Sequence, residues 1–364
     1  MRAVHQITMP RALHPGAWWL WALGLAAAAS RTTNPVPLLL IIAVTAYVVA
    51  ARRTDDPWSR AYAAFLKLAL LIIVIRIVLQ GLLSSSSQGE TVLFTLPELP
   101  LPDWLAGIKL GGEVTAEAVL AATYSGLQLG TILCCVGAAN SLASARRLLA
   151  HLPGALYEAG VACVVALTFA PQLVADAART RQAHRLRGHR PGTLSGLRRT
   201  ALPVLEGALD RSIELAAAMD SRGYGRTTDA DRGSRRRTGL LVGAGLLGIG
   251  VGGYGMLDGG AEQWRGLPTL MLGAAVAGAG LAVGGRRTGR TRYRPEPWAL
   301  PELLVVASGL LAAVAMFVTA ANDPALVTMV DPLAVPDVPW LAVAGIVIAI
   351  APAWVAPPPK GASG

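Results

Sequence analysis

The sequence predicts an all-α fold, a polytopic membrane helix bundle with a cytoplasmic pair of long amphipathic helices. Of the 364 residues, 53% are hydrophobic and only 15% are charged, and the mean hydropathy is +0.50. Soluble domains carry about 25% charged residues, so this composition indicates a membrane protein. The apolar residues gather in separate stretches, and the strongly basic segment 140–238 interrupts their series.

The apolar stretches divide the chain into four parts. Since a full span needs about 20 apolar residues, we expect spans at 17–30, 35–51, 62–83, 114–138, 239–257, 267–285, 303–321 and 339–356. The parts are an N-terminal membrane block, the cytoplasmic segment, a membrane hairpin and a C-terminal extension with two spans, at 1–139, 140–238, 239–300 and 301–364. The first stretch is short, so it and the second are consistent with a shallow hairpin around Asn34-Pro35.

The charges of the loops predict the orientation of the bundle. Arginine is abundant at 52–60 and 286–296, whereas 84–113 and 322–338 contain acids and no arginine. Loops rich in Lys and Arg remain in the cytoplasm, so both termini and residues 140–238 are expected on that side. The membrane is expected to be a bacterial plasma membrane, which the chain crosses several times. This rule explains the net charge of +10 better than nucleic-acid binding does, and the excess of arginine, 29 against 3 lysines, is typical of a GC-rich bacterial genome.

The first long cytoplasmic helix is predicted to end near Gly188. It contains the apolar run 159–171, which is too short to span a membrane comfortably and is expected to be buried or interfacial. It continues into the polar stretch RQAHRLRG, residues 181–188. Arginine side chains complement the negative end of a helix, and glycine is a common C-terminal stop.

The second long helix is predicted to begin near Thr193 or Ser195 and to end at Ser221-Arg222-Gly223. One face carries an apolar series at helical spacing, Leu202, Leu205, Leu209 and Ile213. Pro203 would either kink this helix or mark its start. At 1.5 Å per residue, the helix would form a rod of roughly 40 Å.

Both long helices end in Arg-Gly, at Arg187-Gly188 and at Arg222-Gly223. One such ending is ordinary helix capping, but two of them suggest a recognition feature. A guanidinium is always charged and pairs bidentately with carboxylates, so an arginine at the tip of a rod suits an acidic pocket on another protein. The glycine lets the chain turn sharply without obstructing the approach.

These endings resemble a known pair of signatures. AMDSRGYG, residues 218–225, resembles the second signature of the T component of energy-coupling-factor transporters, the EcfT/CbiQ family, and RQAHRLRG resembles the first, usually written Ala-Arg-Gly. The resemblance extends over about 12–260. In that family, the T component is a membrane scaffold that links two cytoplasmic ABC-type ATPase subunits to a substrate-binding membrane protein, the S component.

The resemblance implies the roles of individual residues. The two long helices would be coupling helices, and the ATPase-docking residues, carried over by position, are Leu186, Arg187, Gly188, Ser221, Arg222 and Gly223. Leu186 and Ser221 stand where each signature begins with alanine. The S component would recognise the substrate, a vitamin, a vitamin precursor, cobalt or nickel. The spans after about residue 300 lie outside the resemblance, and their role is open.

Arg76 is a charged residue inside an apolar span, LLIIVIRIVLQGLL, and is followed by Gln80 four residues later. An arginine within a membrane span is by default a candidate functional site. Contact with the S component is one interpretation of Arg76. Pairing with carbonyl groups inside the bundle, or extension of the side chain to the membrane surface from a tilted helix, are the others.

The glycine-rich spans 239–257 and 267–285 are expected to pack closely. Small residues four positions apart let helix backbones approach one another in lipid. The pairs with this spacing are Gly239/Gly243, Gly248/Gly252 and Gly280/Gly284. Packing within one bundle explains them better than a ligand site does.

The sequence contains no motif for an internal energy source or for catalysis. It has no GxxxxGK[ST] loop for ATP and no acidic residue in the centre of a span for a proton relay. Its three Cys and five His follow no metal-binding or catalytic pattern, so no cofactor and no enzyme activity are expected. Two alternatives remain open: a polytopic membrane enzyme of unknown reaction, and a membrane protein whose basic surface binds anionic lipid.

Overall fold

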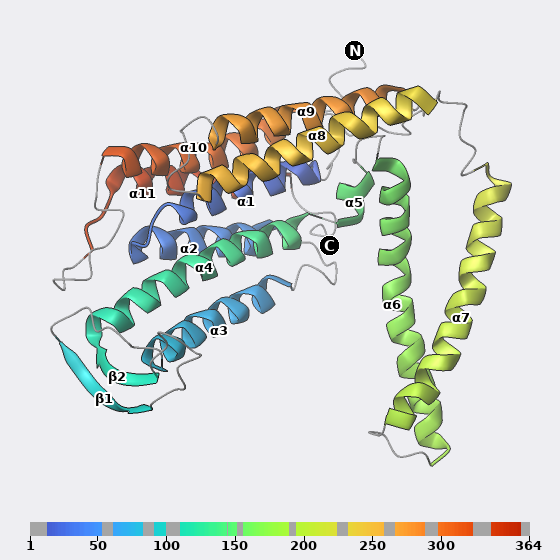
Figure 1. Cartoon of the computed structure of the whole chain (residues 1–364), viewed down its shortest axis with the longest axis horizontal. Coiled ribbons are helices and arrows are strands. Elements are labelled where there is room, and N and C mark those ends of the chain that lie inside the picture. Colours follow the sequence, from blue (N-terminus) through green and yellow to red (C-terminus); the bar gives the residue numbers. More distant parts are fainter. Residues whose placement is uncertain are drawn as a thin grey trace. The chain divides into compact units, whose positions relative to one another are not determined.

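The part of the chain described in the computed structural model is helical apart from one two-stranded sheet (Figure 1). The described residues are 13–52, 61–82, 91–99, 110–143, 145–150, 156–188, 194–223, 232–257, 266–287, 298–322 and 336–357. The chain divides into two compact units, Met1–Leu148 with Arg294–Gly364, and Leu149–Tyr293. The predicted all-α class is confirmed.

The first unit combines elements from both ends of the chain. They are α1 (Pro15–Ser30), α2 (Pro35–Arg52), α3 (Ala61–Leu82), β1 (Val92–Leu99), β2 (Leu110–Thr115), α4 (Ala116–Leu142), α10 (Leu300–Asn322), α11 (Trp340–Ile348) and α12 (Pro352–Val355). The short α5 (Ala145–Ala150) lies at the boundary between the units. The second unit contains α6 (Tyr157–Leu186), α7 (Leu194–Ser221), α8 (Arg232–Leu257) and α9 (Leu267–Arg287).

Seven described helices are long and apolar enough to cross a membrane, judged by length and composition: α2, α3, α4, α6, α8, α9 and α10. Six of them coincide with predicted spans. The first predicted span is the 16-residue α1, and the last is a short apolar segment, Trp340–Val355, so neither has the length of the other seven. The additional helix is α6. The apolar run 159–171 was predicted to be too short to span, but α6 continues through Pro171 and as a whole is long and apolar enough to do so.

Helix α1 forms the centre of the first unit. Ala17, Trp21, Leu25 and Ala28 are fully buried, and α1 packs against α10, α4 and α2. An apolar helix without a polar face is expected in the interior of a bundle. Other helices of its unit therefore cover one side of the short first stretch, while Leu20 and Leu23 on its other side are exposed.

Glycine allows α1 and α10 to approach backbone to backbone. A Cβ atom placed on Gly24 would lie 2.5 Å from the carbonyl oxygen of Gly309, and one placed on Gly309 would lie 2.7 Å from the Cα of Trp21. No larger residue fits at either position without a shift of the backbone. This contact joins two helices that are almost 300 residues apart in sequence.

The C-terminal extension is an integral part of the first unit. Helices α10, α11 and α12 pack against α1 and α2 (Figure 1). Side chains of the N-terminal block also bond to the extension's backbone: the Trp21 indole N–H donates to the Ala349 carbonyl over 3.1 Å, and Arg52 Nε donates to the Ala353 carbonyl over 2.9 Å. The Asn34 amide donates to the Asp337 carbonyl over 2.7 Å.

Helix α3 packs along the glycine-containing face of α4. A Cβ atom on Gly137 would lie 2.6 Å from the Cβ of Phe65, and one on Gly130 would lie 3.1 Å from the Cβ of Ala69. Most of the remaining α3 surface is exposed within the described part of the unit. The helix therefore lies at the edge of the first unit.

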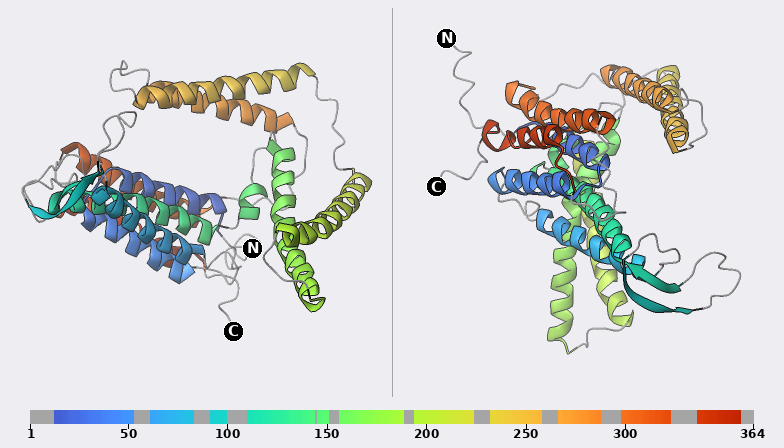
Figure 2. Two further views of the ribbon diagram at one scale, coloured as in Figure 1. Left: turned by 60° about the horizontal axis from the view of Figure 1, so that its bottom comes forward. Right: turned by 90° about the vertical axis from the view of Figure 1, so that its left-hand side faces the viewer.

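Strands β1 and β2 form an antiparallel hairpin at one end of α3 and α4 (Figures 1 and 2). The sequence analysis expected no strand in the acidic loop 84–113. Apolar and β-branched residues such as Val92, Phe94 and Thr95 favour a strand, and Gly111 and Gly112 adopt φ values of 94° and 115° that other residues rarely adopt. The signal was present, but it was short, and Pro97 within β1 argues against a strand.

Helices α8 and α9 lie side by side, as two views agree (Figures 1 and 2). A Cβ atom on Gly248 would lie 2.9 Å from the Gly273 Cα, and one on Gly280 would lie 3.0 Å from the Leu241 Cβ. The predicted close packing is confirmed for Gly248, Gly252 and Gly280. For Gly239 and Gly243 it is wrong, since no described atom lies within 4 Å of a Cβ on either.

Candidate functional site

The two long helices of the predicted cytoplasmic segment are α6 and α7, with 30 and 28 residues. At 1.5 Å per residue they form rods of about 45 and 42 Å. Both continue through an internal proline, Pro171 in α6 and Pro203 in α7. Pro203 therefore does not mark the start of the second helix, which begins at Leu194 as the sequence predicted within a residue or two.

The Arg-Gly endings of the two helices have the same local structure. Helix α6 is followed by Arg187 at the C-cap and by Gly188 with φ of 77°. Helix α7 is followed by Arg222 and by Gly223 with φ of 75°. The Gly188 N–H donates to the Arg185 carbonyl over 3.0 Å, and the Gly223 N–H donates to the Asp220 carbonyl over 2.9 Å.

Glycine is required at these positions for a physical reason. A left-handed backbone brings the Cβ of an L-residue close to the following carbonyl oxygen, and glycine avoids this contact. The turn closes the last carbonyl groups of each helix, as in common C-terminal capping motifs. Each arginine is thereby held at the end of a rigid rod.

The candidate docking residues are accessible. Leu186 is 85% exposed, and Arg187, Gly188, Ser221, Arg222 and Gly223 are also exposed. Within the described residues, neither Arg187 nor Arg222 forms an ion pair. In Figure 1, α6 runs downward and α7 runs upward. The C-terminal ends of the two helices therefore lie at opposite ends of the pair.

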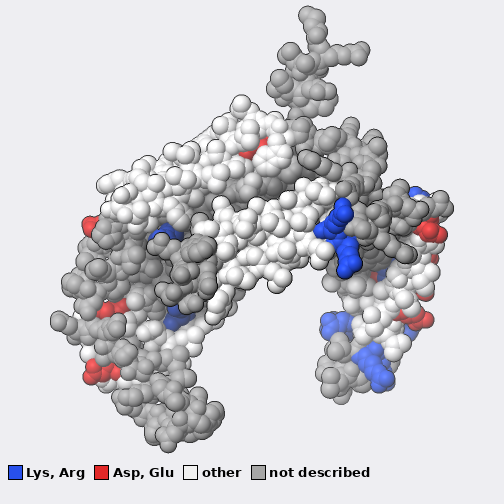
Figure 3. Space-filling view, turned by 45° about the horizontal axis from the view of Figure 1, so that its top comes forward, with Lys and Arg blue, Asp and Glu red and all other residues white. Residues whose placement is uncertain are grey.

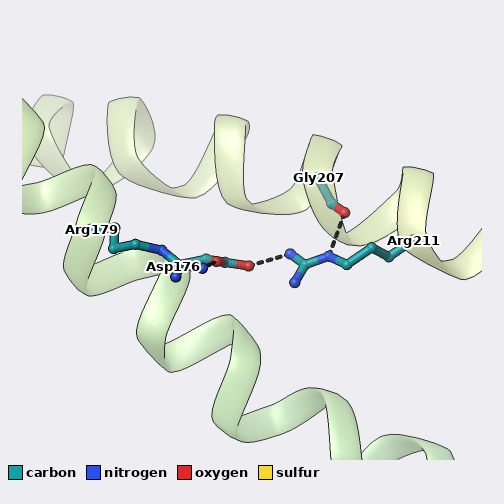
Figure 4. A network of polar contacts seen from close by, with 4 residues as sticks. All are labelled: Asp176, Arg179, Gly207 and Arg211. Carbon is teal, nitrogen blue, oxygen red and sulfur yellow. Dashed lines mark hydrogen bonds and ion pairs between the residues drawn. The ribbon is translucent and has the colours of Figure 1, made fainter.

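An ionic cluster joins α6 to α7 where they cross (Figure 4). Asp176 of α6 accepts hydrogen bonds from Arg211 of α7 and from Arg179 of its own helix. The Nε of Arg211 also donates to the Gly207 carbonyl over 3.0 Å. The Asp176 side chain is only 16% exposed, against 33% for Arg211 and 74% for Arg179.

The sequence analysis missed this cluster because it depends on how two helices cross. One signal was available: Asp176 is the single acidic residue between 159 and 188. An isolated carboxylate on a helix rich in arginine could have directed attention to a cross-helix partner.

The apolar series of α7 does not face α6. Leu202, Leu205, Leu209 and Ile213 are each between 61% and 66% exposed in the structure. Their predicted helical spacing is confirmed, but the described chain does not cover them. In Figure 3 the broad uncharged surface lies over the centre and upper left, whereas charged side chains of both signs are visible on the right-hand side, where Figure 1 draws α6 and α7.

Arg76 lies on the exposed surface of α3, within one of the seven apolar helices. Its Cβ is 3.5 Å from a Cβ placed on Gly126 of α4, so the base of the side chain contacts the neighbouring helix. Among the described residues Arg76 has no ion-pair partner, and it is not enclosed in the bundle. The docking arginines and Arg76 belong to different units and are not brought together by either one.

The cysteines are distributed without forming a site. Cys134 and Cys135 are buried in α4, whereas Cys163 is exposed on α6. The described part of the chain contains no group of three or more His, Cys, Asp or Glu side chains placed to hold a metal ion.

The sequence was also compared with known proteins. The model of the cobalt transport protein family, CbiQ, matches residues 6–231, which include both Arg-Gly endings. No curated protein matches the chain. The matched region contains α1 to α7 and stops before α8.

Proposed function

Because the chain belongs to the CbiQ family of cobalt transport proteins, we propose that it is the coupling subunit of an energy-coupling-factor importer. Membership of this family identifies the chain as a component of a membrane transporter. Our proposal adds that this component transmits motion from two ABC-type ATPase subunits to a substrate-binding membrane S component. The substrate is a micronutrient, with cobalt as the first candidate because the family description names it.

The observation that carries the proposal is the pair of matching helix endings. Arg187 and Arg222 each follow the last residue of a long helix, each precedes a left-handed glycine, and each is exposed. A fixed guanidinium can donate two parallel hydrogen bonds to a carboxylate. Two identical endings on two helices fit two copies of one kind of partner, as a pair of ATPase subunits would present.

The mechanism follows from the stiffness of the helices. A helix of about 40 Å transmits a displacement of its tip along its whole length, since its backbone hydrogen bonds resist bending. ATP binding and hydrolysis in the ATPases would move the two tips, and α6 and α7 would carry that motion to the membrane side of the transporter. The chain itself supplies position and force transmission, and the ATPases supply the chemistry.

We place α6 and α7 in the cytoplasm. The last third of α6, which follows Asp176, carries Arg179, Arg181 and Arg185, Arg187 stands at its C-cap, and α7 carries charged residues along its length. Such charges are costly inside lipid, although the apolar content of α6 alone would allow a span.

A cysteine at Ala217, an exposed residue of α7, tests this location in a Cys163→Ser background. A membrane-impermeant maleimide should label it in inside-out vesicles and not in intact spheroplasts. Thr95→Cys, in the exposed part of β1, should show the reverse pattern. Labelling of Ala217→Cys from the outside would contradict the placement.

Charge reversal at the tips tests the docking role. Arg187→Glu and Arg222→Glu should each weaken copurification of the ATPase subunits with the tagged chain from its host, and the double variant should abolish it. Matched controls are Arg181→Glu and Arg198→Glu, since both are exposed arginines on the same two helices away from the tips. Membrane insertion should be unchanged in all four. Full ATPase recovery with the double variant would refute the assignment of these residues.

A further inference from the structure

We propose that the ion pair between Asp176 and Arg211 is a positioning element that fixes the crossing of α6 and α7 and thereby the separation of the two Arg-Gly tips. The structural part of this inference is argued from the contacts of Asp176, Arg179 and Arg211 alone. Its consequence for transport rests on the proposed function, and the experiments below separate the two.

The two carboxylate oxygens of Asp176 accept hydrogen bonds from arginines on two different helices. One carboxylate oxygen, Oδ1, accepts from Arg179, which lies one turn further along α6. The other, Oδ2, accepts from Arg211 on α7. Arg179 is largely exposed, whereas Asp176 is mostly enclosed and Arg211 is two-thirds covered. The interaction across the helices is therefore the better shielded of the two.

The backbone of α7 also orients Arg211. Its Nε donates to the carbonyl of Gly207 one turn earlier, while its terminal nitrogen reaches Asp176 (Figure 4). This second bond directs the guanidinium toward α6. Side chains that are restrained before they meet their partner lose less entropy on pairing.

Apolar packing contributes less at this crossing than in the first unit. The apolar series of α7 is exposed, so these large side chains are not used against α6. An open hollow of about 290 Å³ lies at the crossing, lined by Thr180, Pro203 and Val204 together with the charged cluster. With a loose contact of this kind, one ion pair can decide the angle between the helices.

Asp176 and Arg211 lie at equal distances along the sequence from the Arg-Gly ends of their own helices. Arg187 lies eleven positions after Asp176, and Arg222 lies eleven positions after Arg211. Each contact residue is therefore about 16 Å from its own docking arginine along the helix axis. A rotation about the ion pair would move both tips by the same amount, which suits engagement of two equivalent ATPase subunits.

The structural test measures the distance between the helices in the complete chain. Spin labels on Ala183→Cys and Ala217→Cys, both exposed, report one distance in lipid nanodiscs when Cys163 is replaced by serine. The parent chain should give a narrow distance distribution by pulsed electron paramagnetic resonance. Asp176→Asn and Arg211→Gln should each broaden or shift it.

Two further variants give the structural test its controls. Arg179→Gln removes the partner on the same helix and should leave the distribution narrow. The charge exchange Asp176→Arg with Arg211→Asp should restore a distribution close to that of the parent. An unchanged distribution in Arg211→Gln, or equal broadening in Arg179→Gln, would overturn the proposal.

The functional test uses the same variants in the host. Asp176→Asn and Arg211→Gln should reduce micronutrient uptake several-fold while both ATPase subunits still copurify, and the charge exchange should recover uptake. Normal uptake in variants with a broadened distribution would overturn the role of the pair in transport. If the parent chain recovers no ATPase, the proposed function fails, whereas the distance measurement still decides whether the ion pair sets the crossing.

Discussion

The core around α1 and the pair formed by α6 and α7 are held together in opposite ways. In the first unit, helices from both ends of the chain approach backbone to backbone at Gly24 and Gly309, and Trp21 bonds to the Ala349 carbonyl. In the α6–α7 pair, an ion pair lies at the crossing and the apolar series of α7 is exposed. Close-packed interiors resist deformation, so the comparison separates a rigid frame from a pair of helices whose crossing depends on one ionic contact.

The difference also explains the C-terminal extension. The family model matches residues 6–231 and does not reach the extension, yet α10 to α12 complete the core that α1 and α2 begin. The extension is therefore part of the packed core of the first unit. Three predictions test this comparison, beginning with the largest expected effect.

Deletion of the extension should remove the rigidity of the frame. A chain ending at residue 299 lacks α10, α11 and α12, which leaves Trp21 without its contacts to Gly309 and Ala349 and Arg52 without its carbonyl acceptor. We expect aggregation in detergent and rapid proteolysis of the N-terminal block. Size-exclusion chromatography and limited proteolysis measure this.

The control for the deletion is a chain ending at residue 357, which keeps every described helix and strand. It should behave as the complete chain does. A monodisperse, protease-resistant protein from the shorter version would show that the extension is an appendage and that the frame ends with α4.

Gly24→Ala should destabilise the frame without removing any element. Its Cβ would lie 2.5 Å from the carbonyl oxygen of Gly309, so α1 and α10 must separate. Overpacking of this kind costs about 1–3 kcal/mol, which thermal unfolding in detergent should register as a lower Tm. Gly81→Ala, where nothing lies within 4 Å, is the matched control in the same unit. Equal Tm values for the two variants would argue against the close contact.

The sequence predicted the elements of this protein better than their contacts. The lengths of α7 and of six membrane-capable helices follow from apolar content and helix-ending residues that are local in the chain. The Gly24–Gly309 contact and the Asp176–Arg211 pair depend on residues that meet only after folding. Local patterns also led to the error at Gly239 and Gly243. Small residues allow close packing, but their spacing does not determine which face of a helix packs against its neighbour.

Substitution of the tip glycines should have the smallest and most local effect. In Gly188→Ala and Gly223→Ala, nothing lies within 4 Å of the new methyl group, so the cost arises only from the left-handed backbone. That conformation costs an L-residue about 1–2 kcal/mol, which is smaller than or equal to the cost of the Gly24 clash and confined to one exposed turn. The Tm of the frame should be unchanged, while ATPase binding should weaken by a factor of about 5–30.

Two further variants distinguish backbone strain from the mere loss of a glycine at the tips. Gly188→Asn and Gly223→Asn should recover most of the binding, because asparagine tolerates the left-handed region better than alanine does. Gly207→Ala lies within α7, where a Cβ would be 3.8 Å from Arg211, an ordinary contact, and it should bind as the parent does. A fall in the Tm of the frame in the tip variants would show that the two regions are mechanically linked at rest. Failure of asparagine to restore binding would mean that the orientation of Arg187 and Arg222 does not depend on the turn that follows them.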